Sequence, residues 1–215
     1  MPKSTFYNID EEKRERIIEV IIDEFSENTY ETASINQIVK TSEIAKGSFY
    51  QYFEDKLDIY KLAMQISQKE RINYIERVNE NERYKDEFRI MRELCVAIIK
   101  FEIDRPKYSS IINKFHKNTD IELKNEVLKD VEIGSRYEFK TILQEGIDSG
   151  KIYYNVDVEL MAFLLENISR NIKEYFNIKR REDKYVNYEG FVNTAIDLVE
   201  NGIKSKRKSR IDDIL

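Results

Sequence analysis

Apolar side chains recur at helical spacing along most of the chain, and no segment of useful length alternates apolar and polar residues with a period of two. Near the start, Ile17, Val20, Ile21 and Phe25 mark one such helical face. Only two prolines and six glycines interrupt the 215 residues, and these are the residues that helices tolerate least. The pattern therefore predicts an all-α fold.

Capping residues and apolar stripes predict where the helices begin and end. Asn8 or Asp10 opens the first helix, and Ser34 with Gln37 forms a capping box at the second. The expected helices cover residues 10–28, 34–40, 46–52, 55–79, 88–104, 107–117, 121–149 with a bend at Gly134, 158–176 and 188–204. Because short helices give way to long ones after Arg71, we expect a domain over residues 8–71, a second over 72–205 and a flexible tail over 206–215.

The composition disfavours a membrane protein and an exported one. The longest apolar runs, such as residues 95–99, are far too short to span a bilayer. The first residues lack the apolar core of an export signal. Cys95 is the single cysteine, so no internal disulfide can form, and in its apolar run it is expected to be a core residue. We therefore expect a cytoplasmic protein with no membrane partner.

Residues 34–53 read S-I-N-Q-I-V-K-T-S-E-I-A-K-G-S-F-Y-Q-Y-F, and they predict two short helices joined by a tight turn. Helices this short need neighbouring helices for support. A short helix that projects its polar beginning suits entry into the major groove of DNA, so we expect a helix-turn-helix. The alternative is a pair of ordinary short helices in an all-α domain.

The residue types of the second of these helices fit contacts with DNA. Gly47 lets the backbone approach the duplex, because it carries no Cβ. Hydroxyl and ammonium groups here can meet phosphate oxygens, and Gln51 can read adenine or simply be a solvated surface residue. Phe49 and Phe53 form the inward face. The candidate DNA-binding residues are Ser34, Gln37, Lys46, Gly47, Ser48, Tyr50, Gln51, Tyr52 and Lys56.

The run A-K-G-S-F-Y-Q-Y-F-E-D-K-L-D-I-Y, residues 45–60, closely resembles the signature of the TetR/AcrR (tetracycline-repressor) family, and the resemblance extends over roughly residues 10–65. It implies a DNA-binding transcriptional regulator, most often a repressor, that binds a palindromic operator as a homodimer and is released by a small-molecule effector. The helical domain over residues 72–205 would then bind the effector, expected to be largely apolar, and form the dimer. That half of the chain has no signature of its own.

Two positions depart from the family pattern. The turn carries Glu43 where the family usually has glycine, so this residue is expected in a left-handed conformation. Ala45 replaces the usual serine or threonine cap of the following helix. Both departures concern the geometry of the turn and remove no candidate DNA contact.

The charge of the N-terminal part is unusual for a DNA-binding protein. Residues 1–60 hold seven basic and thirteen acidic side chains, a net charge of −6. Most of the acids lie on the first predicted helix, where they can face away from DNA. We therefore expect a shallow salt dependence of DNA binding and weak non-specific affinity.

The second domain offers candidates for an effector pocket and for a dimer interface. Aromatic residues at helical spacing are also typical of plain core. The pocket candidates are Phe101, Tyr108, Phe115, Tyr137, Phe139, Phe163 and Asn167. Apolar stripes over residues 160–176 and 191–199 look too wide for burial on one side, which predicts four-helix packing across a dimer axis. The interface candidates are Leu164, Ile168, Ile172, Phe191, Ala195 and Leu198.

Nothing in the sequence favours catalysis. It contains no phosphate-binding glycine loop, no metal-ligand spacing and no nucleophile elbow. Cys95 and His116, the single cysteine and the single histidine, lie far apart in the sequence. We therefore expect no enzyme, no cofactor and no metal site. The acidic N-terminal half keeps one alternative open, an all-α ligand-binding or interaction protein that does not read DNA.

Overall fold

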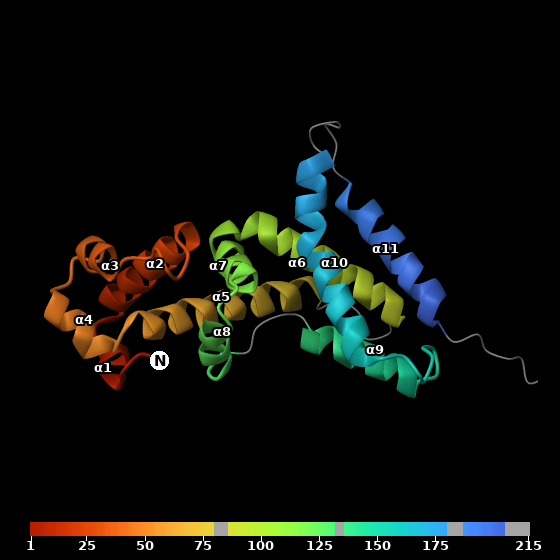
Figure 1. The fold of residues 1–215 in the computed structure, drawn as a ribbon, viewed down its shortest axis with the longest axis horizontal. Helices are drawn as coiled ribbons and strands as arrows, with labels where there is room; N and C mark the ends of the chain where they lie inside the picture. Colours follow the sequence, from red (N-terminus) through yellow and green to blue (C-terminus); the bar gives the residue numbers. More distant parts are fainter. Residues whose placement is uncertain (80–85, 132–135, 180–186, 205–215) are drawn as a thin grey trace, which may run out of the picture. The chain divides into compact units, whose positions relative to one another are not determined.

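A computed structural model describes residues 1–79, 86–131, 136–179 and 187–204, and over these ranges the chain is helical and contains no strand (Figure 1). The prediction of an all-α fold is confirmed. The helices are α1 (Ser4–Tyr7), α2 (Glu11–Glu27), α3 (Ile35–Thr41), α4 (Lys46–Tyr52), α5 (Lys56–Asn79), α6 (Glu87–Asp104), α7 (Pro106–Lys117), α8 (Ile121–Leu128), α9 (Arg136–Asp148), α10 (Val158–Lys179) and α11 (Tyr188–Ile203). No helix of the described residues is long and apolar enough to cross a membrane.

The helices form two compact units. The first contains residues 1–76 and 101–133, so α7 and α8 pack in the same unit as α2, α3 and α4. The second contains residues 77–100 and the chain from residue 134 onward. The expected boundary between residues 71 and 72 separates a DNA-binding domain from an effector-binding one, and this functional division stays a prediction. The expected tail over 206–215 lies outside the described residues.

The core of the first unit is built on aromatic rings. Phe25 of α2 and Phe49 of α4 are buried in one cluster with Phe53, which follows α4. The rings of Phe49 and Phe53 lie 5.3 Å apart between their centroids, as expected for an inward face. The apolar face of α2 adds Ile17 and Ile21, both fully buried. This packing supports two helices, α3 and α4, that are too short to be stable alone.

Side chains cap the helices largely where the sequence predicts. Asp10 accepts from the Lys13 amide at 3.1 Å at the start of α2, and Asp55 accepts from the Asp58 amide at 3.0 Å before α5. Asp157 accepts from the Leu160 amide at 3.0 Å and opens α10. These bonds satisfy amide groups that a helix leaves free at its beginning.

Two predicted features are wrong or incomplete. The helix α1 was not expected, and its Phe6 is fully buried. The single helix predicted over residues 121–149 is wrong, because α8 ends at Leu128. Just past this end the buried Lys61 pairs with Asp130 at 2.5 Å, and Val131 is buried, so tertiary contacts fix the chain there. The predicted bend at Gly134 lies outside the described residues.

The second unit holds α9, α10 and α11 with most of α6. Arg92 of α6 contacts Asp197 and Glu200 of α11 at 2.5 and 2.8 Å. The Ser169 hydroxyl of α10 lies 3.1 Å from the Cys95 sulfur of α6. Cys95 is buried as expected, and burial raises the pKa of its thiol to about 11. A thiol held neutral in this way has a structural role.

Candidate DNA-binding site

The turn between α3 and α4 has the geometry of a helix-turn-helix with one strained residue. Ser34 caps α3 by accepting from the Gln37 main-chain amide at 3.3 Å. The predicted capping box is only half formed, because the Ser34 amide donates to the Glu24 carboxylate at 2.8 Å and not to the Gln37 side chain. At the other end of α3 the Ser42 hydroxyl donates to the Ile38 carbonyl at 2.6 Å. Glu43 then adopts a φ of 56°, the left-handed conformation expected from its replacement of glycine. Ala45 makes no side-chain cap to α4, as its identity predicts.

Helix α4 divides its residues between core and solvent. Phe49 and Tyr52 point inward and are buried. On the other side lie four exposed residues, which we call the exposed face of α4: Lys46, Gly47, Tyr50 and Gln51. This face combines an ammonium, a phenol, a carboxamide and a backbone free of Cβ, which are groups suited to phosphate and base edges.

Gly47 is not required by packing. A Cβ built at this position meets no heavy atom within 4 Å. Glycine inside a helix also costs about 0.5–1 kcal/mol relative to alanine. The fold therefore supplies no reason for glycine here, whereas close approach of a duplex does.

Several other candidates have contacts within the first unit. Ser48 is half-buried, and Gln37 is exposed with its amide nitrogen donating to the Thr41 hydroxyl at 3.0 Å. The Tyr52 ring is 6% exposed, and its hydroxyl accepts from Lys13 Nζ at 3.2 Å. Lys56 Nζ donates to the carbonyl groups of Glu31 and Ala33 at 3.1 and 3.2 Å. Tyr52 thus contacts α2, and Lys56 contacts the segment between α2 and α3. Their phosphate contacts stay predictions.

Sequence reasoning missed the segment in front of α2. Figure 1 shows α1 beside α4, and Lys3 and Thr5 donate hydrogen bonds to carbonyl groups at the end of α4. The only signal in the sequence is the apolar Phe6 in a polar stretch, which is too weak to predict a four-residue helix.

One face of α7 holds the C-terminal end of α2. Lys107 pairs with Asp23 at 2.5 Å, and the Ser110 hydroxyl donates to the Ser26 carbonyl at 2.8 Å. One turn further, Lys114 Nζ donates to carbonyl groups of the same helix end. These residues follow one another at helical spacing, so a single stripe of α7 contacts the end of α2, the helix that precedes the helix-turn-helix.

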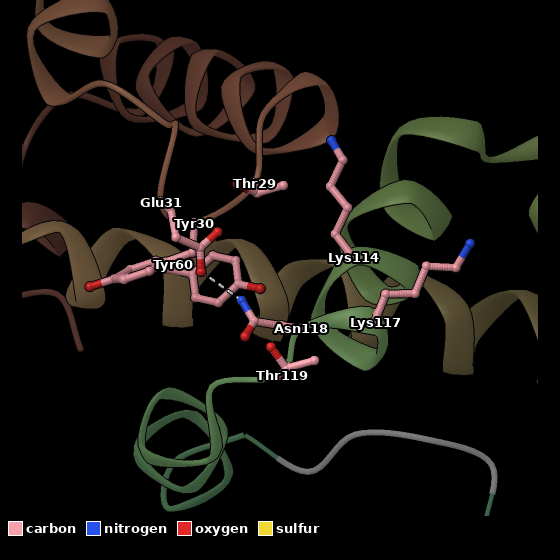
Figure 2. Close-up of a pocket in the computed structure, with 8 residues that line it drawn as sticks. All are labelled: Thr29, Tyr30, Glu31, Tyr60, Lys114, Lys117, Asn118 and Thr119. Atoms are coloured by element: carbon pink, nitrogen blue, oxygen red, sulfur yellow. Dashed lines mark hydrogen bonds between the residues drawn. The ribbon is translucent and has the colours of Figure 1, made fainter.

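A pocket of about 350 Å³, lined by polar, charged and tyrosine side chains, lies beside this contact. Figure 2 shows its lining, with Lys114 reaching toward α2 and a hydrogen bond of 2.8 Å from Asn118 to Glu31 across it. Tyr60 forms part of the wall, and burial raises the pKa of its phenol. The pocket is lined by Thr29, Tyr30, Glu31, Tyr60, Lys114, Lys117, Asn118 and Thr119. None of the predicted pocket residues is among them, and the mixed charges do not match an apolar effector.

The predicted effector-pocket residues fall into both units. In the first, Phe101 and Phe115 are buried in the aromatic core and Tyr108 is packed against it. In the second, Phe139 is fully buried while Phe163 is exposed, and the Asn167 side-chain Nδ2 donates to the Phe163 carbonyl at 2.8 Å. The side chain of Tyr137 lies outside the described part. A common pocket stays a prediction.

The predicted dimer residues lie on α10 and α11, and several are open to solvent. Leu164 of α10 and Leu198 of α11 are 43% and 73% exposed, and Leu160 and Phe163, close to Leu164 in sequence, are exposed as well. Ile168, Phe191 and Ala195 are half-buried. The side chain of Ile172 is not among those described. Within the described residues no group of three or more metal-ligating side chains gathers.

Comparisons with known proteins agree with this geometry. The sequence model of the family described as bacterial regulatory proteins, tetR family, matches residues 17–63, from α2 to α5. The fatty acid metabolism regulator protein of Bacillus subtilis (strain 168) is 26% identical over 197 residues, which is 89% of this chain and 95% of that protein.

Two crystal structures share the fold over nearly the whole chain. A TetR family transcriptional regulator from Chloroflexus aurantiacus J-10-FL is 28% identical with a TM-score of 0.69, over 96% of this chain and 100% of that one. The transcriptional regulator FadR from Bacillus subtilis, in complex with stearoyl-CoA, is 21% identical with a TM-score of 0.65, over 88% and 98%.

Proposed function

We propose that the chain is a DNA-binding transcriptional regulator of the TetR family, and that it is a homodimeric repressor released from a palindromic operator by a fatty acyl thioester. The exposed face of α4 carries the DNA-binding part of the proposal. Its groups are open to solvent, and Gly47 has no packing role that explains the absence of a side chain. Insertion of this face into the major groove uses both properties.

The dimer is proposed from the apolar surface of the second unit. Large apolar side chains on α10 and α11 are exposed in the single chain, among them Leu164 and Leu198. Exposed apolar surface of this kind marks an interaction site. A two-fold axis would bring two copies of the surface together and place two α4 helices in successive major grooves, about 34–36 Å apart.

The effector class is proposed from the relatives. The curated relative regulates fatty acid metabolism, and the FadR structure contains stearoyl-CoA. An acyl chain also fits the largely apolar effector expected from the aromatic residues of the C-terminal half. The relatives are regulators rather than enzymes, and we accordingly propose a cytoplasmic protein that acts by binding alone.

We propose the contact between α7 and α2 as the route by which an effector acts on DNA binding. An effector shifts the equilibrium only if it binds two conformations with different affinity. The stripe of Lys107, Ser110 and Lys114 ties α7 to the end of α2 through one ion pair and several hydrogen bonds. A shift of α7 would therefore move the helix-turn-helix and change the spacing of the two α4 helices.

The proposal is tested by a mobility shift with DNA from upstream of the protein's own gene, comparing wild type with Tyr50→Ala and Lys46→Ala. We expect a specific shift for wild type and a loss of about tenfold in affinity for each variant. Stearoyl-CoA should release the DNA, and coenzyme A alone should not. If neither stearoyl-CoA nor coenzyme A releases the DNA, the proposal of an acyl thioester as effector is refuted. If no shift occurs even at low salt, the result favours an all-α ligand-binding protein that does not read DNA.

A further inference from the structure

The C-terminal end of α4 is held by residues from outside that helix. A helix leaves its last four carbonyl groups without partners of its own. In α4 the Phe49 carbonyl accepts from the Phe53 amide at 2.9 Å. The next three, of Tyr50, Gln51 and Tyr52, all accept hydrogen bonds from residues 3–5.

Each of these three bonds has a different donor. Lys3 Nζ donates to the Tyr50 carbonyl at 3.0 Å, and the Lys3 amide donates to the Tyr52 carbonyl at 2.8 Å. The Thr5 hydroxyl donates to the Gln51 carbonyl. The carbonyl groups bound in this way include those of two residues on the exposed face of α4, Tyr50 and Gln51.

An aromatic anchor keeps the donors in place. Phe6 follows Thr5 in α1 and is fully buried. Its ring lies 4.8 Å from that of Phe53 and 6.0 Å from that of Tyr52, measured between centroids. Burying a ring of this size stabilises by about 2–3 kcal/mol. The segment of Lys3 to Phe6 is therefore fixed against the end of α4.

The charge of Lys3 is used inside the protein. Its ammonium forms an ion pair with Glu54 at 2.8 Å and also contacts the negative end of the α4 dipole. The neighbouring Glu54 carboxylate weakens the attraction of this ammonium for a phosphate. The geometry fits a brace for α4 better than a direct contact with DNA.

We infer that Lys3 and Thr5 are positioning residues for DNA recognition: they hold the C-terminal end of α4 so that Tyr50 and Gln51 meet the duplex in the required orientation. The inference rests on DNA binding by α4. A helix of seven residues cannot hold its own end in place, so loss of the brace would fray the last turn. Fraying lowers the fraction of protein that can bind, and the measured affinity falls with that fraction.

The test uses full-length variants and an operator selected from random duplexes by the wild-type protein. Lys3→Met removes the ammonium but keeps the stem, and Thr5→Val removes the hydroxyl at constant shape. We expect each to lower operator affinity by about fivefold, as for one hydrogen bond, and the double variant by about 20-fold. Thr5→Ser should restore binding, and Ser4→Ala on the same helix should leave it unchanged.

Two further readouts separate a brace from a phosphate contact or a general folding defect. If Lys3 and Thr5 hold the end of α4, their variants should have the same salt slope of binding as wild type. The variants should also show faster hydrogen exchange, and only for the α4 amides. If Lys3→Met lowers the salt slope by about one and weakens binding to every duplex equally, Lys3 contacts phosphate and the inference is overturned. The inference is also overturned if both variants bind the operator as tightly as wild type, or if the α4 amides of both exchange hydrogen as slowly as in wild type. If wild type itself selects no sequence, DNA binding has failed, and that outcome is distinct from failure of the brace alone.

Discussion

The ammonium group of Lys114 donates a hydrogen bond of 2.5 Å to the main-chain carbonyl of Ser26 and further bonds to the carbonyls of Phe25 and Asn28. Lys114 belongs to α7, and the three carbonyls lie at the end of α2. The positive charge therefore caps the negative end of α2, the helix that precedes the helix-turn-helix. Burial lowers the pKa of this lysine, so its placement has a cost that the carbonyl groups offset.

Lys114→Met should weaken both the fold and the response to effector. The variant leaves carbonyl groups of α2 without their donor, which costs about 1–3 kcal/mol in the free energy of unfolding. It should also need more stearoyl-CoA to release DNA, because one of the contacts that couple α7 to α2 is lost while those of Lys107 and Ser110 remain. Urea unfolding and a release titration measure the two effects. The matched control is Lys117→Met, on the same helix and exposed; equal effects in both variants would contradict the role of Lys114.

Glu43→Gly should stabilise the protein. Glu43 has a φ of 56°, a conformation that disfavours residues with a Cβ. Glycine removes the strain but has a more flexible unfolded state, so we expect a net gain of about 0.5–1 kcal/mol. Reversible urea unfolding measures it. Glu43→Ala keeps the Cβ and should show no such gain; a similar gain in both variants would show that the carboxylate, not the backbone, is the cause.

Glu87→Gln should change the stability of the second unit in a pH-dependent way. Burial raises the pKa of Glu87, but its hydrogen bonds to Lys151 at 2.8 and 2.9 Å, with others, outweigh burial and lower it overall. Because the pKa of Glu87 is lower in the folded than in the unfolded protein, the ionised carboxylate stabilises the fold fully at a pH above the ordinary pKa of 4.5. This stabilisation is lost as the pH falls through the folded pKa.

The free energy of unfolding of wild type should therefore exceed that of Glu87→Gln by about 1–3 kcal/mol at pH 7. The difference should shrink below pH 4.5. Unfolding curves at several pH values measure it. Glu145→Gln changes an exposed carboxylate of the same unit and should match wild type at every pH. A difference that stays constant down to acid pH would rule out the ion pair as its source.

Leu198→Glu should convert the proposed dimer to a monomer. Leu198 is 73% exposed on α11, and a carboxylate buried between two copies would lack a partner. Analytical ultracentrifugation measures the mass. Tyr154→Glu is a control outside α10 and α11, at an even more exposed site of 88%, and should remain dimeric. A wild-type monomer, or a dimer in both variants, would contradict the proposed interface.

The helix-turn-helix could be predicted from sequence because its signals are local. The cap of α3 by Ser34, and the left-handed turn at Glu43, each depend on residues within one or two turns of the chain. The aromatic pair of Phe49 and Phe53 follows from helical spacing alone. Helix α4 accordingly has the predicted bounds.

The missed features depend on contacts between distant parts of the chain. Lys61 and Asp130 are 69 residues apart, and their ion pair lies next to the end of α8 where a continuous helix was expected. Lys56 was a candidate phosphate ligand, but its ammonium contacts the carbonyl groups of Glu31 and Ala33. No local pattern predicts either contact, since a lysine has the same appearance in sequence whether it binds DNA or its own backbone.

The most direct test of DNA recognition by α4 is the operator affinity of Gly47→Ala, measured beside its thermal unfolding. Because a Cβ at Gly47 meets no protein atom within 4 Å, the fold should be as stable as wild type or up to about 1 kcal/mol more stable. The added methyl should instead meet the duplex and lower operator affinity by at least about tenfold, the loss expected for an imperfectly fitted recognition contact. Unchanged operator affinity in a stable Gly47→Ala protein would contradict the account.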